Sequence, residues 1–173
     1  MARSAHAEHP CGKRPCVAGK AVNLEDVFPP NFVRLDLGIL DKGHVLSGMA
    51  KLLASSSGAP VALIESALLA RENLGSTGVG AGVALPHARL HALNATHGVF
   101  MRLAAPIAFD AIDGKPVDLV CGIIAPDEPN AALLTALSAI SRALRDESKT
   151  ATLRGTYDPV EARRIPVSYT HLT

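Results

Sequence analysis

A histidine that follows a glycine-rich segment is the most chemically suggestive feature of this sequence. Residues 75–87 read Gly-Ser-Thr-Gly-Val-Gly-Ala-Gly-Val-Ala-Leu-Pro-His, with glycine at 75, 78, 80 and 82. Glycine permits backbone angles that other residues avoid and lets another molecule come close to the main chain. An imidazole is the side chain whose neutral form is available near pH 7. The pattern predicts a nucleophile or a ligand at His87, although this histidine taken alone would be read as structural or exposed.

Two metal-binding patterns compete with this interpretation. His87 and His91 are four residues apart, a spacing that converges on a metal ion when the segment is helical. Pro86 and the apolar run before it argue against a helix at that point. A second group of candidate ligands lies near the N-terminus, at His6, His9, Cys11 and Cys16. Their spacing fits no common closed zinc site, so we expect no metal at either place.

The segments before His87 predict the elements that position it. Residues 32–37 alternate with period two and predict a strand. Asp41 is a good N-cap for a helix to about residue 54, which the Ser-Ser-Ser-Gly run at 55–58 would end. Pro60 suits the start of a second amphipathic helix that runs into the glycine-rich loop and carries Arg71 on its last turn.

Further strands and helices are predicted on both sides of His87. The apolar run at 83–85 predicts a buried strand that Pro86 stops, so that His87 lies at a strand end before a polar segment. Residues 98–103 and the near-continuous apolar run at 117–125 predict two more strands, with a hairpin-type Asp-Gly signal at 113–114. The last predicted elements are helices at 133–146, around 150–153, and from 158 onward.

The interleaving of these elements predicts an α/β fold: a single domain with a mixed β-sheet flanked by helices on both faces. The glycine-rich segment follows a helix and precedes a strand, whereas a dinucleotide fingerprint requires the opposite order. No Gly-Lys-Ser or Gly-Lys-Thr sequence is present to form a nucleotide phosphate loop. We therefore expect neither a Rossmann site nor a nucleotide cofactor.

Composition excludes several other classes of function. The 173 residues carry a net charge of +1 with no clustered basic face, which argues against nucleic-acid binding. Aromatic residues make up 3% of the sequence and tryptophan is absent, so few side chains are available to stack against bases or sugars. Three cysteines make no disulfide framework, and Cys121 is predicted to be buried in an apolar run. With no apolar span long enough to enter a membrane and no signal peptide, we expect a cytoplasmic protein.

Two long motifs resemble those of the IIA proteins of the bacterial phosphotransferase system. The first is Leu-Ala-Arg-Glu at 69–72 followed by the glycine-rich segment that ends in Leu-Pro-His, and the second is Ala-Pro-Ile-Ala-Phe-Asp-Ala-Ile-Asp-Gly-Lys-Pro-Val-Asp-Leu at 105–119. Within that family the chain is most similar to the nitrogen-regulatory branch, a close relative of the fructose and mannitol IIA domains. The resemblance covers residues 23–164 and implies a fructose/mannitol IIA-like fold.

By this resemblance His87 matches the histidine that IIA proteins phosphorylate. That histidine takes a phosphoryl group from a small histidine phosphocarrier (HPr-like) and passes it on, which requires a neutral imidazole nitrogen and N–H or positive groups around the phosphoryl oxygens, but no cofactor. Arg71 matches the family's arginine and would neutralise the phosphate, although it could equally serve the helix dipole. Four residues are expected to support a phosphate loop: Ser76, Thr77, Gly78 and Gly80. Ser76 and Thr77 could instead be turn or cap residues.

One position departs from the family pattern. Many members carry a second histidine at the start of the helix after the long apolar strand, and Leu133 falls there in this chain. Leucine cannot hydrogen-bond a phosphohistidine, so onward transfer to a sugar-specific IIB partner becomes doubtful. In the second motif we interpret Asp110, Asp113 and Asp118 as turn and surface carboxylates rather than catalytic acids.

The resemblance leaves more than one function open. The first is a nitrogen-regulatory phosphohistidine carrier that accepts a phosphoryl group on His87 and signals through its phosphorylation state. The second is a regulatory protein-binding module with weak or no onward transfer, and a fructose-type IIA component feeding a separate IIB is a further alternative. We expect residues 1–22 to be a disordered leader, 23–164 to be the IIA domain, and 165–173, which look foreign to the family, to be a truncated or non-native tail.

Overall fold

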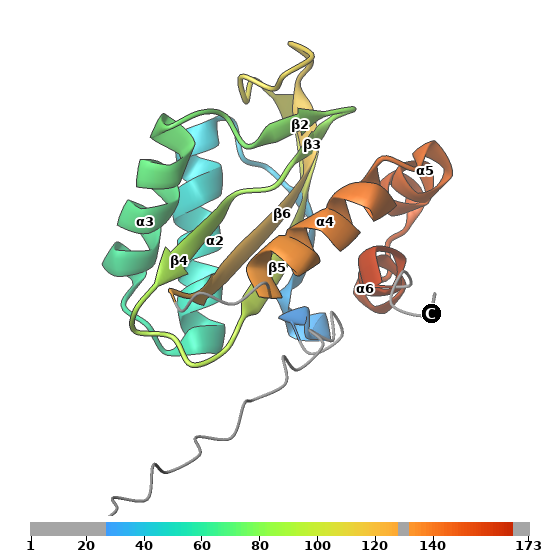
Figure 1. Cartoon of the computed structure of the whole chain (residues 1–173). Helices are drawn as coiled ribbons and strands as arrows, with labels where there is room; N and C mark the ends of the chain where they lie inside the picture. Colours follow the sequence, from blue (N-terminus) through green and yellow to red (C-terminus); the bar gives the residue numbers. More distant parts are fainter. Residues whose placement is uncertain (1–26, 128–131, 168–173) are drawn as a thin grey trace, which may run out of the picture.

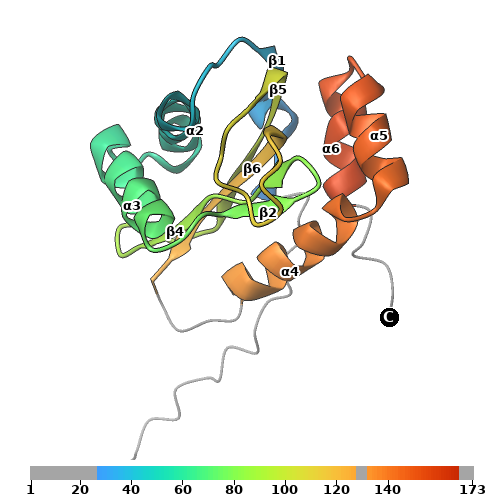
Figure 2. The same ribbon diagram turned by 90° about the horizontal axis from the view of Figure 1, so that it is seen from above.

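The computed structural model describes residues 27–127 and 132–167. Its centre is a six-stranded mixed sheet with helices on both faces, which confirms the predicted fold class (Figure 1 and Figure 2). The elements are η1 (Pro30–Phe32), β1 (Val33–Leu37), α2 (Lys42–Ser57), α3 (Val61–Asn73), β2 (Gly78–Gly80), β3 (Val83–Ala84), β4 (His87–Leu90), β5 (His97–Ile107), β6 (Val117–Pro126), α4 (Ala132–Leu144), α5 (Glu147–Gly155) and α6 (Pro159–Val167). None of the helices within the described residues is long and apolar enough to cross a membrane.

The sheet is built around β6. It pairs antiparallel with β5, as the Asp-Gly signal in the connection between them predicts, and β5 pairs in parallel with β1. The other edge of β6 is shared by β3 and β4, which both run parallel to it, and β2 lies outside β3 as an antiparallel strand. Along this edge Val83 lies opposite Leu119 and His87 lies opposite Ile123.

His87 opens a strand, whereas we expected it to lie at a strand end before a polar segment. β3 and β4 both pair with β6, and Pro86, which has no N–H group, interrupts this pairing at the point between the two strands. Its carbonyl still accepts a hydrogen bond from the N–H of Ile123 at 3.0 Å, so the chain stays in register with β6 and pairing resumes at His87. The interruption is therefore a short break in one long edge, and His87 is the first residue after it.

The glycine-rich segment, which we expected to be a loop, is partly a strand. Residues Gly78–Gly80 form β2, because the segment turns back and pairs with β3. A Cβ added to Gly78 would lie 2.7 Å from the Cα of Ala111, so glycine here is required by a close approach of two backbones. The glycine content of this strand therefore serves packing inside the domain.

Two apolar cores lie on the two faces of the sheet. α2 and α3 cover one face, and α4, α5 and α6 cover the other (Figure 2). Successive residues of β6 alternate between them: Val120 and Ile124 belong to the first core, and Leu119, Cys121 and Ile123 to the second. This alternation explains why the strand reads as a continuous apolar run, and it confirms that Cys121 is buried.

α2 extends through the serine run, whereas the sequence predicts that the helix ends before it. Asp41 caps the helix as predicted, accepting a hydrogen bond from the N–H of His44 at 2.9 Å. The helix nevertheless continues through Ser57, since the hydroxyl groups of Ser55 and Ser57 donate to main-chain carbonyls four residues back. Gly58, with φ of +74°, then ends it.

The two ends of the chain fall largely outside the described residues. This holds for the predicted leader at 1–22, with its histidines and cysteines, and for residues 168–173 of the predicted tail. α6 continues to Val167, and Ile165 packs against the second core.

Candidate functional site

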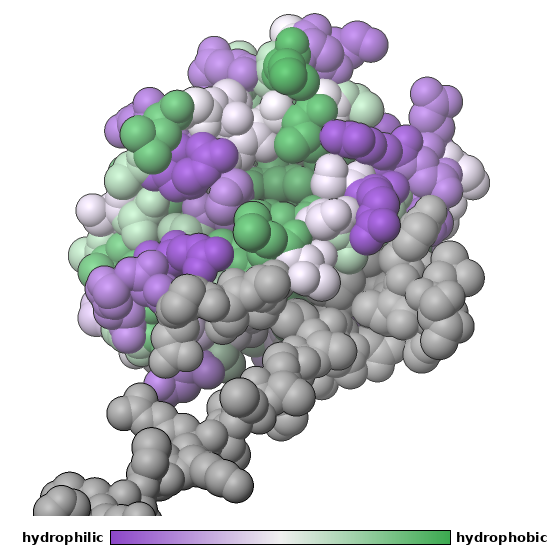
Figure 3. All heavy atoms as spheres, viewed as in Figure 1, coloured by the Kyte–Doolittle hydropathy of each residue, from purple (hydrophilic) through white to green (hydrophobic). Residues whose placement is uncertain are grey.

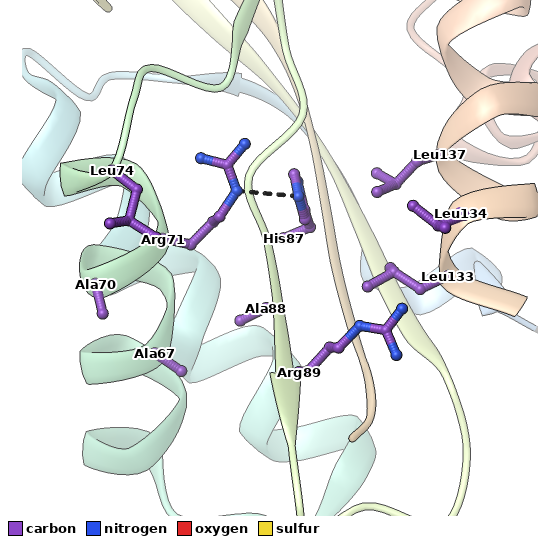
Figure 4. A pocket seen from close by; sticks show the side chains of 10 residues that line it. All are labelled: Ala67, Ala70, Arg71, Leu74, His87, Ala88, Arg89, Leu133, Leu134 and Leu137. Carbon is purple, nitrogen blue, oxygen red and sulfur yellow. Dashed lines mark hydrogen bonds between the residues drawn. The ribbon is translucent and has the colours of Figure 1, made fainter. Parts of the chain in front are cut away.

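The two ring nitrogens of His87 have different partners. Nδ1 lies 2.8 Å from the carbonyl oxygen of Leu85. Because a carbonyl only accepts hydrogen bonds, Nδ1 carries the ring proton and Nε2 keeps its lone pair. The Nε–H group of Arg71 donates to that lone pair across 3.2 Å (Figure 4). The site therefore presents a neutral imidazole with Nε2 as its nucleophilic atom.

The surroundings of His87 keep the ring uncharged. Burial is the main effect that lowers the pKa of His87 below its ordinary value near 6.5, against the raising effect of the Leu85 carbonyl. The guanidinium groups of Arg71 and Arg89 lower the pKa further, and the carboxylate of Glu72 raises it. The net shift is downward, so the ring is neutral at pH 7.

Arg71 reaches His87 from the last turn of α3. Its Nη1 atom donates to the carbonyl oxygen of Gly75 at 2.9 Å while its Nε donates to His87. The structure thus brings together Arg71 and His87, which are 16 residues apart in the sequence. It also shows the guanidinium bound to a carbonyl just beyond the helix end, so the two interpretations of this arginine, as a phosphate partner and as a helix-end residue, are geometrically compatible.

A cavity of about 620 Å³ opens in front of the imidazole, between α3 and α4. Figure 4 shows His87 between Arg71 on one side and the leucines of α4 on the other. The lining is mostly apolar and consists of Ala67, Ala70, Arg71, Leu74, His87, Ala88, Arg89, Leu133, Leu134 and Leu137. In the space-filling view, apolar surface gathers in the middle of this face with hydrophilic residues on both sides (Figure 3).

Leucines form the wall of the cavity opposite Arg71. Leu133 is buried, with 3% of its surface exposed, whereas Leu134 is 65% exposed at the rim. Leu74 at the end of α3 is 86% exposed on the facing rim. Leu133, at the position where the resemblance implies a second histidine, therefore lines the cavity of His87 and presents an apolar side chain to it.

The residues expected to form a phosphate loop are bound elsewhere. Ser76 donates from its hydroxyl group to the carbonyl of Phe109 at 2.7 Å, and the N–H and hydroxyl groups of Thr77 donate to the carboxylate of Glu72. Gly78 donates its N–H to the hydroxyl oxygen of Ser76, and Gly80 lies against Asp113. None of the four lines the cavity, so their placement favours the turn interpretation of Ser76 and Thr77.

Arg89 and Glu72 are site residues that the sequence analysis missed. Arg89 follows His87 by two positions on β4, and side chains two apart on a strand share a face. The sequence contains this spacing, but residues 88–96 are interpreted as a polar segment that predicts no strand, so the spacing alone does not place Arg89 beside His87. Glu72 is buried beside Arg71, and its carboxylate lies 2.7 Å from Nζ of Lys42 in α2. No pattern in the sequence indicates that Glu72 and Lys42 form an ion pair.

The remaining candidate side chains make contacts outside the cavity. Asp110 and Asp113 are exposed; Asp110 pairs with Lys42, and Asp113 accepts from the N–H of Ala81. Asp118 is half-buried on β6 and pairs with Arg154 at 2.7 Å, so it is an ion-pair residue of the sheet rather than a surface turn. His91 pairs with Asp127 at 2.8 Å. Within the part of the chain that the structure describes, no group of three metal-ligating side chains comes together.

Comparison with known proteins identifies the fold and the family. The family described as "Phosphoenolpyruvate-dependent sugar phosphotransferase system, EIIA 2" matches residues 26–165. The nitrogen regulatory protein of Bradyrhizobium diazoefficiens is 38% identical over 135 residues, covering 78% of this chain and 88% of that protein.

Solved structures agree with this assignment. The nitrogen regulatory protein IIA-Ntr from Neisseria meningitidis superimposes with a TM-score of 0.80 at 32% identity, over 83% of this chain and 98% of that one. The Escherichia coli complex of mannitol enzyme IIA with phosphorylated enzyme IIB gives a TM-score of 0.68 at 21% identity, over 79% and 94%, which shows likeness of fold alone. The chain therefore belongs to the EIIA 2 family of the phosphoenolpyruvate-dependent sugar phosphotransferase system, within its nitrogen-regulatory branch.

Proposed function

We propose that this protein is a cytoplasmic phosphohistidine carrier, with residues 23–164 as its phosphotransferase domain. It accepts a phosphoryl group on Nε2 of His87 from the phosphohistidine of a small carrier protein, and its phosphorylation state is the signal. One observation carries the proposal: the Leu85 carbonyl occupies Nδ1, which leaves Nε2 with a lone pair at an open cavity beside a guanidinium.

The transfer balances without a metal or a nucleotide. The lone pair of Nε2 attacks phosphorus, the bond between phosphorus and the donor's ring nitrogen breaks, and the electron pair of that bond returns to the donor ring. His87 keeps its Nδ1 proton, and the positive charge that develops on its ring is stabilised by the hydrogen bond to the Leu85 carbonyl. No proton has to leave the site during the step.

Two arginines, Arg71 and Arg89, line the cavity that the phosphoryl group would enter. Arg71 gives up its bond to Nε2 when phosphorus takes that position, and the released N–H group can turn to a phosphoryl oxygen while Nη1 stays on Gly75. Arg89 lies on the same face of β4 and lines the same cavity. The other walls are apolar, so once a docked carrier excludes water from the cavity these charges stabilise transferring phosphate more strongly than in water.

The apolar wall favours a signalling role over onward transfer to a IIB protein. Leu133 offers no hydrogen bond to a phosphohistidine, so a group that would tune its reactivity is absent. A phosphate on His87 adds about −1.5 to −2 charges to an apolar rim that includes Leu74 and Leu134. This change is sufficient to alter the preference of a regulatory target that contacts the rim. A fructose-type component feeding a separate IIB is the alternative that the leucine wall disfavours.

The test is phosphoryl acceptance in a reconstituted system. The purified protein is mixed with labelled phosphoenolpyruvate and the two general phosphotransferase proteins, one of which is the histidine phosphocarrier. We expect acid-labile label on the wild type and none on His87→Ala, with His91→Ala as the matched control that keeps its label. NMR of the phosphorylated protein is expected to show phosphorus on Nε2. An unlabelled wild type, or label that survives in His87→Ala, would refute the proposal.

A further inference from the structure

Glu72 is a buried carboxylate directly next to Arg71 in α3. It is 7% exposed, and hydrogen-bond donors converge on it from two other segments of the chain. Nζ of Lys42 lies 2.7 Å from one oxygen, and the N–H of Thr77 lies 3.1 and 3.2 Å from the two oxygens. The hydroxyl group of Thr77 also donates to this carboxylate. Glu72 therefore joins the end of α3 to the start of α2 and to the glycine-rich segment.

These bonds close a turn that holds Arg71. The N–H of Gly75 donates to the main-chain carbonyl of Glu72 at 3.1 Å, and the carbonyl of Gly75 accepts from Nη1 of Arg71 at 2.9 Å. Gly75 has φ of +154°, which glycine adopts readily and a side chain would not. The carboxylate of Glu72 ties the far end of this turn at Thr77, two residues beyond the carbonyl to which Arg71 donates.

We propose that Glu72 is a positioning residue for phosphoryl acceptance: its carboxylate clamps the turn at residues 72–77, and the Gly75 carbonyl then holds the guanidinium of Arg71 against Nε2 of His87. The inference rests on the proposed function for its effect on transfer, but its structural claim can be tested independently. It also gives the Ser-Thr pair of the glycine-rich motif a role, which is to anchor the turn rather than to bind phosphate.

The charge of Glu72 is maintained in spite of its burial. Burial by itself raises the pKa of this carboxyl group, but the bonds from Lys42 and Thr77 outweigh burial and hold the pKa below its ordinary value. Lys42 is itself held by Asp110 at 3.0 Å and lies 5.0 Å from the centre of the Phe109 ring. A glutamine at position 72 would offer one acceptor oxygen to three donors and would turn an N–H group toward Lys42 or Thr77, so the clamp would loosen.

The pKa of His87 can distinguish a positioning role of Glu72 from a purely electrostatic one. The carboxylate of Glu72 raises the pKa of His87, and the guanidinium of Arg71 lowers it. If Glu72 acted only through its charge, Glu72→Gln would lower the pKa of His87. If Glu72 holds Arg71 in place, the variant also moves the cation away from the ring, which raises the pKa of His87 and offsets the loss of the carboxylate.

The experiment is a double-mutant cycle on the full chain with two independent readouts. The His87 ring is titrated by NMR in the wild type, Glu72→Gln, Arg71→Ala and the double variant, and the rate of phosphoryl acceptance is measured at several carrier concentrations. We expect Glu72→Gln to lower the pKa of His87 when Arg71 is absent, and to lower it less, or to raise it, when Arg71 is present. We expect the maximal acceptance rate to fall by about ten- to a hundredfold, with little change in the carrier concentration at half-maximal rate.

Asp113→Ala is the matched control. Asp113 also holds the glycine-rich segment by accepting a main-chain N–H, at Ala81, but it does not touch the turn that carries Arg71. This variant is expected to leave both readouts unchanged. If Glu72→Gln does not fold, Thr77→Val, which removes only the hydroxyl donor, is expected to shift both readouts in the same directions by a smaller amount.

The experiment distinguishes failure of the positioning role of Glu72 from failure of the proposed function. An equal fall in the pKa of His87 on Glu72→Gln with and without Arg71, or an Asp113→Ala variant that behaves like Glu72→Gln, would overturn the positioning role. A wild type that accepts no phosphoryl group would remove the proposed function, and the titration would still decide whether Glu72 holds Arg71.

Discussion

Arg71 donates a hydrogen bond from its Nε–H group to Nε2 of His87 across 3.2 Å, so a cation covers the atom that is free to react. This contact has two consequences. It favours the neutral imidazole, because a nearby positive charge opposes protonation. It also places a guanidinium where the phosphoryl oxygens would arrive, at the cost of one hydrogen bond that must break during the reaction.

Replacing Arg71 by alanine is expected to slow phosphoryl acceptance by about a hundredfold, since a preorganised donor at the reacting centre is lost. The pKa of His87 is expected to rise, because a cation that lowers it has been removed. The rate is measured as the appearance of acid-labile label, and the pKa by NMR. Arg164→Ala, which removes an exposed arginine on α6, is the charge-matched control. Equal rates for Arg71→Ala and wild type would contradict a role for Arg71 in the transfer.

The lowered pKa of His87 predicts the pH dependence of stability. A histidine that is held neutral in the folded state contributes stability above its unfolded pKa near 6.5, and this contribution is lost as the pH falls through the folded pKa. We expect the melting temperature of the wild type to drop more between pH 7.5 and pH 5 than that of His87→Gln. His97 also has a pKa lowered by burial, so His97→Gln measures its share separately. Parallel curves for the wild type and His87→Gln would rule out the shift.

Introducing a histidine at position 133 tests the leucine wall. Leu133→His places an imidazole in the cavity and is expected to increase phosphoryl transfer from His87 to a separate IIB domain by about tenfold, within the range of acid–base contributions. Stability should fall by roughly 1–3 kcal/mol, because a polar ring replaces a side chain that is 3% exposed. Leu133→Ala opens the same space without adding a ring. If both variants transfer equally fast, the missing hydrogen bond is not what limits the wild type.

A stability prediction concerns Arg102, which lies away from the site. It is 4% exposed, pairs with Asp36 at 2.9 Å, and donates to the carbonyls of Leu153 at 2.8 Å and Thr156 at 2.5 Å. Arg102→Met is expected to lower the free energy of unfolding by about 1–3 kcal/mol, because the buried carbonyls of Leu153 and Thr156 lose their hydrogen-bond donor. Urea denaturation measures this loss. Arg34→Met, a change at a more exposed strand position, should cost far less.

Below the denaturation midpoint, the folded fraction of Arg102→Met is expected to accept phosphate at the wild-type rate. This outcome would separate a scaffold arginine from the site arginine at position 71. A slow rate in the folded fraction would mean that the end of α5 influences the cavity.

Much of the fold followed from local patterns. The near-continuous apolar run of β6, the N-cap at Asp41 and the helix start at Pro60 are properties of consecutive residues, and the structure has each of them where the sequence predicts it. The two errors have different causes. The helix over serines 55–57 is a local effect, in which hydroxyl groups of the run donate to carbonyls of the preceding turn, whereas Gly78–Gly80 is a strand because β3 is available to pair with it.

The sequence by itself determined that His87 is the residue on which the chemistry is expected, because the motif around it is continuous and long. It also determined Arg71 and Leu133 as its relevant partners through the resemblance to the family. Only the tertiary structure decided that Nε2 rather than Nδ1 faces the cavity, that Ser76 and Thr77 bond away from it, and that Glu72 lies under the turn that carries Arg71. The physical reason is that hydrogen-bond partners far apart in the chain depend on how α3, β4 and α4 pack, and the spacing of residues along the sequence does not encode which atoms then meet.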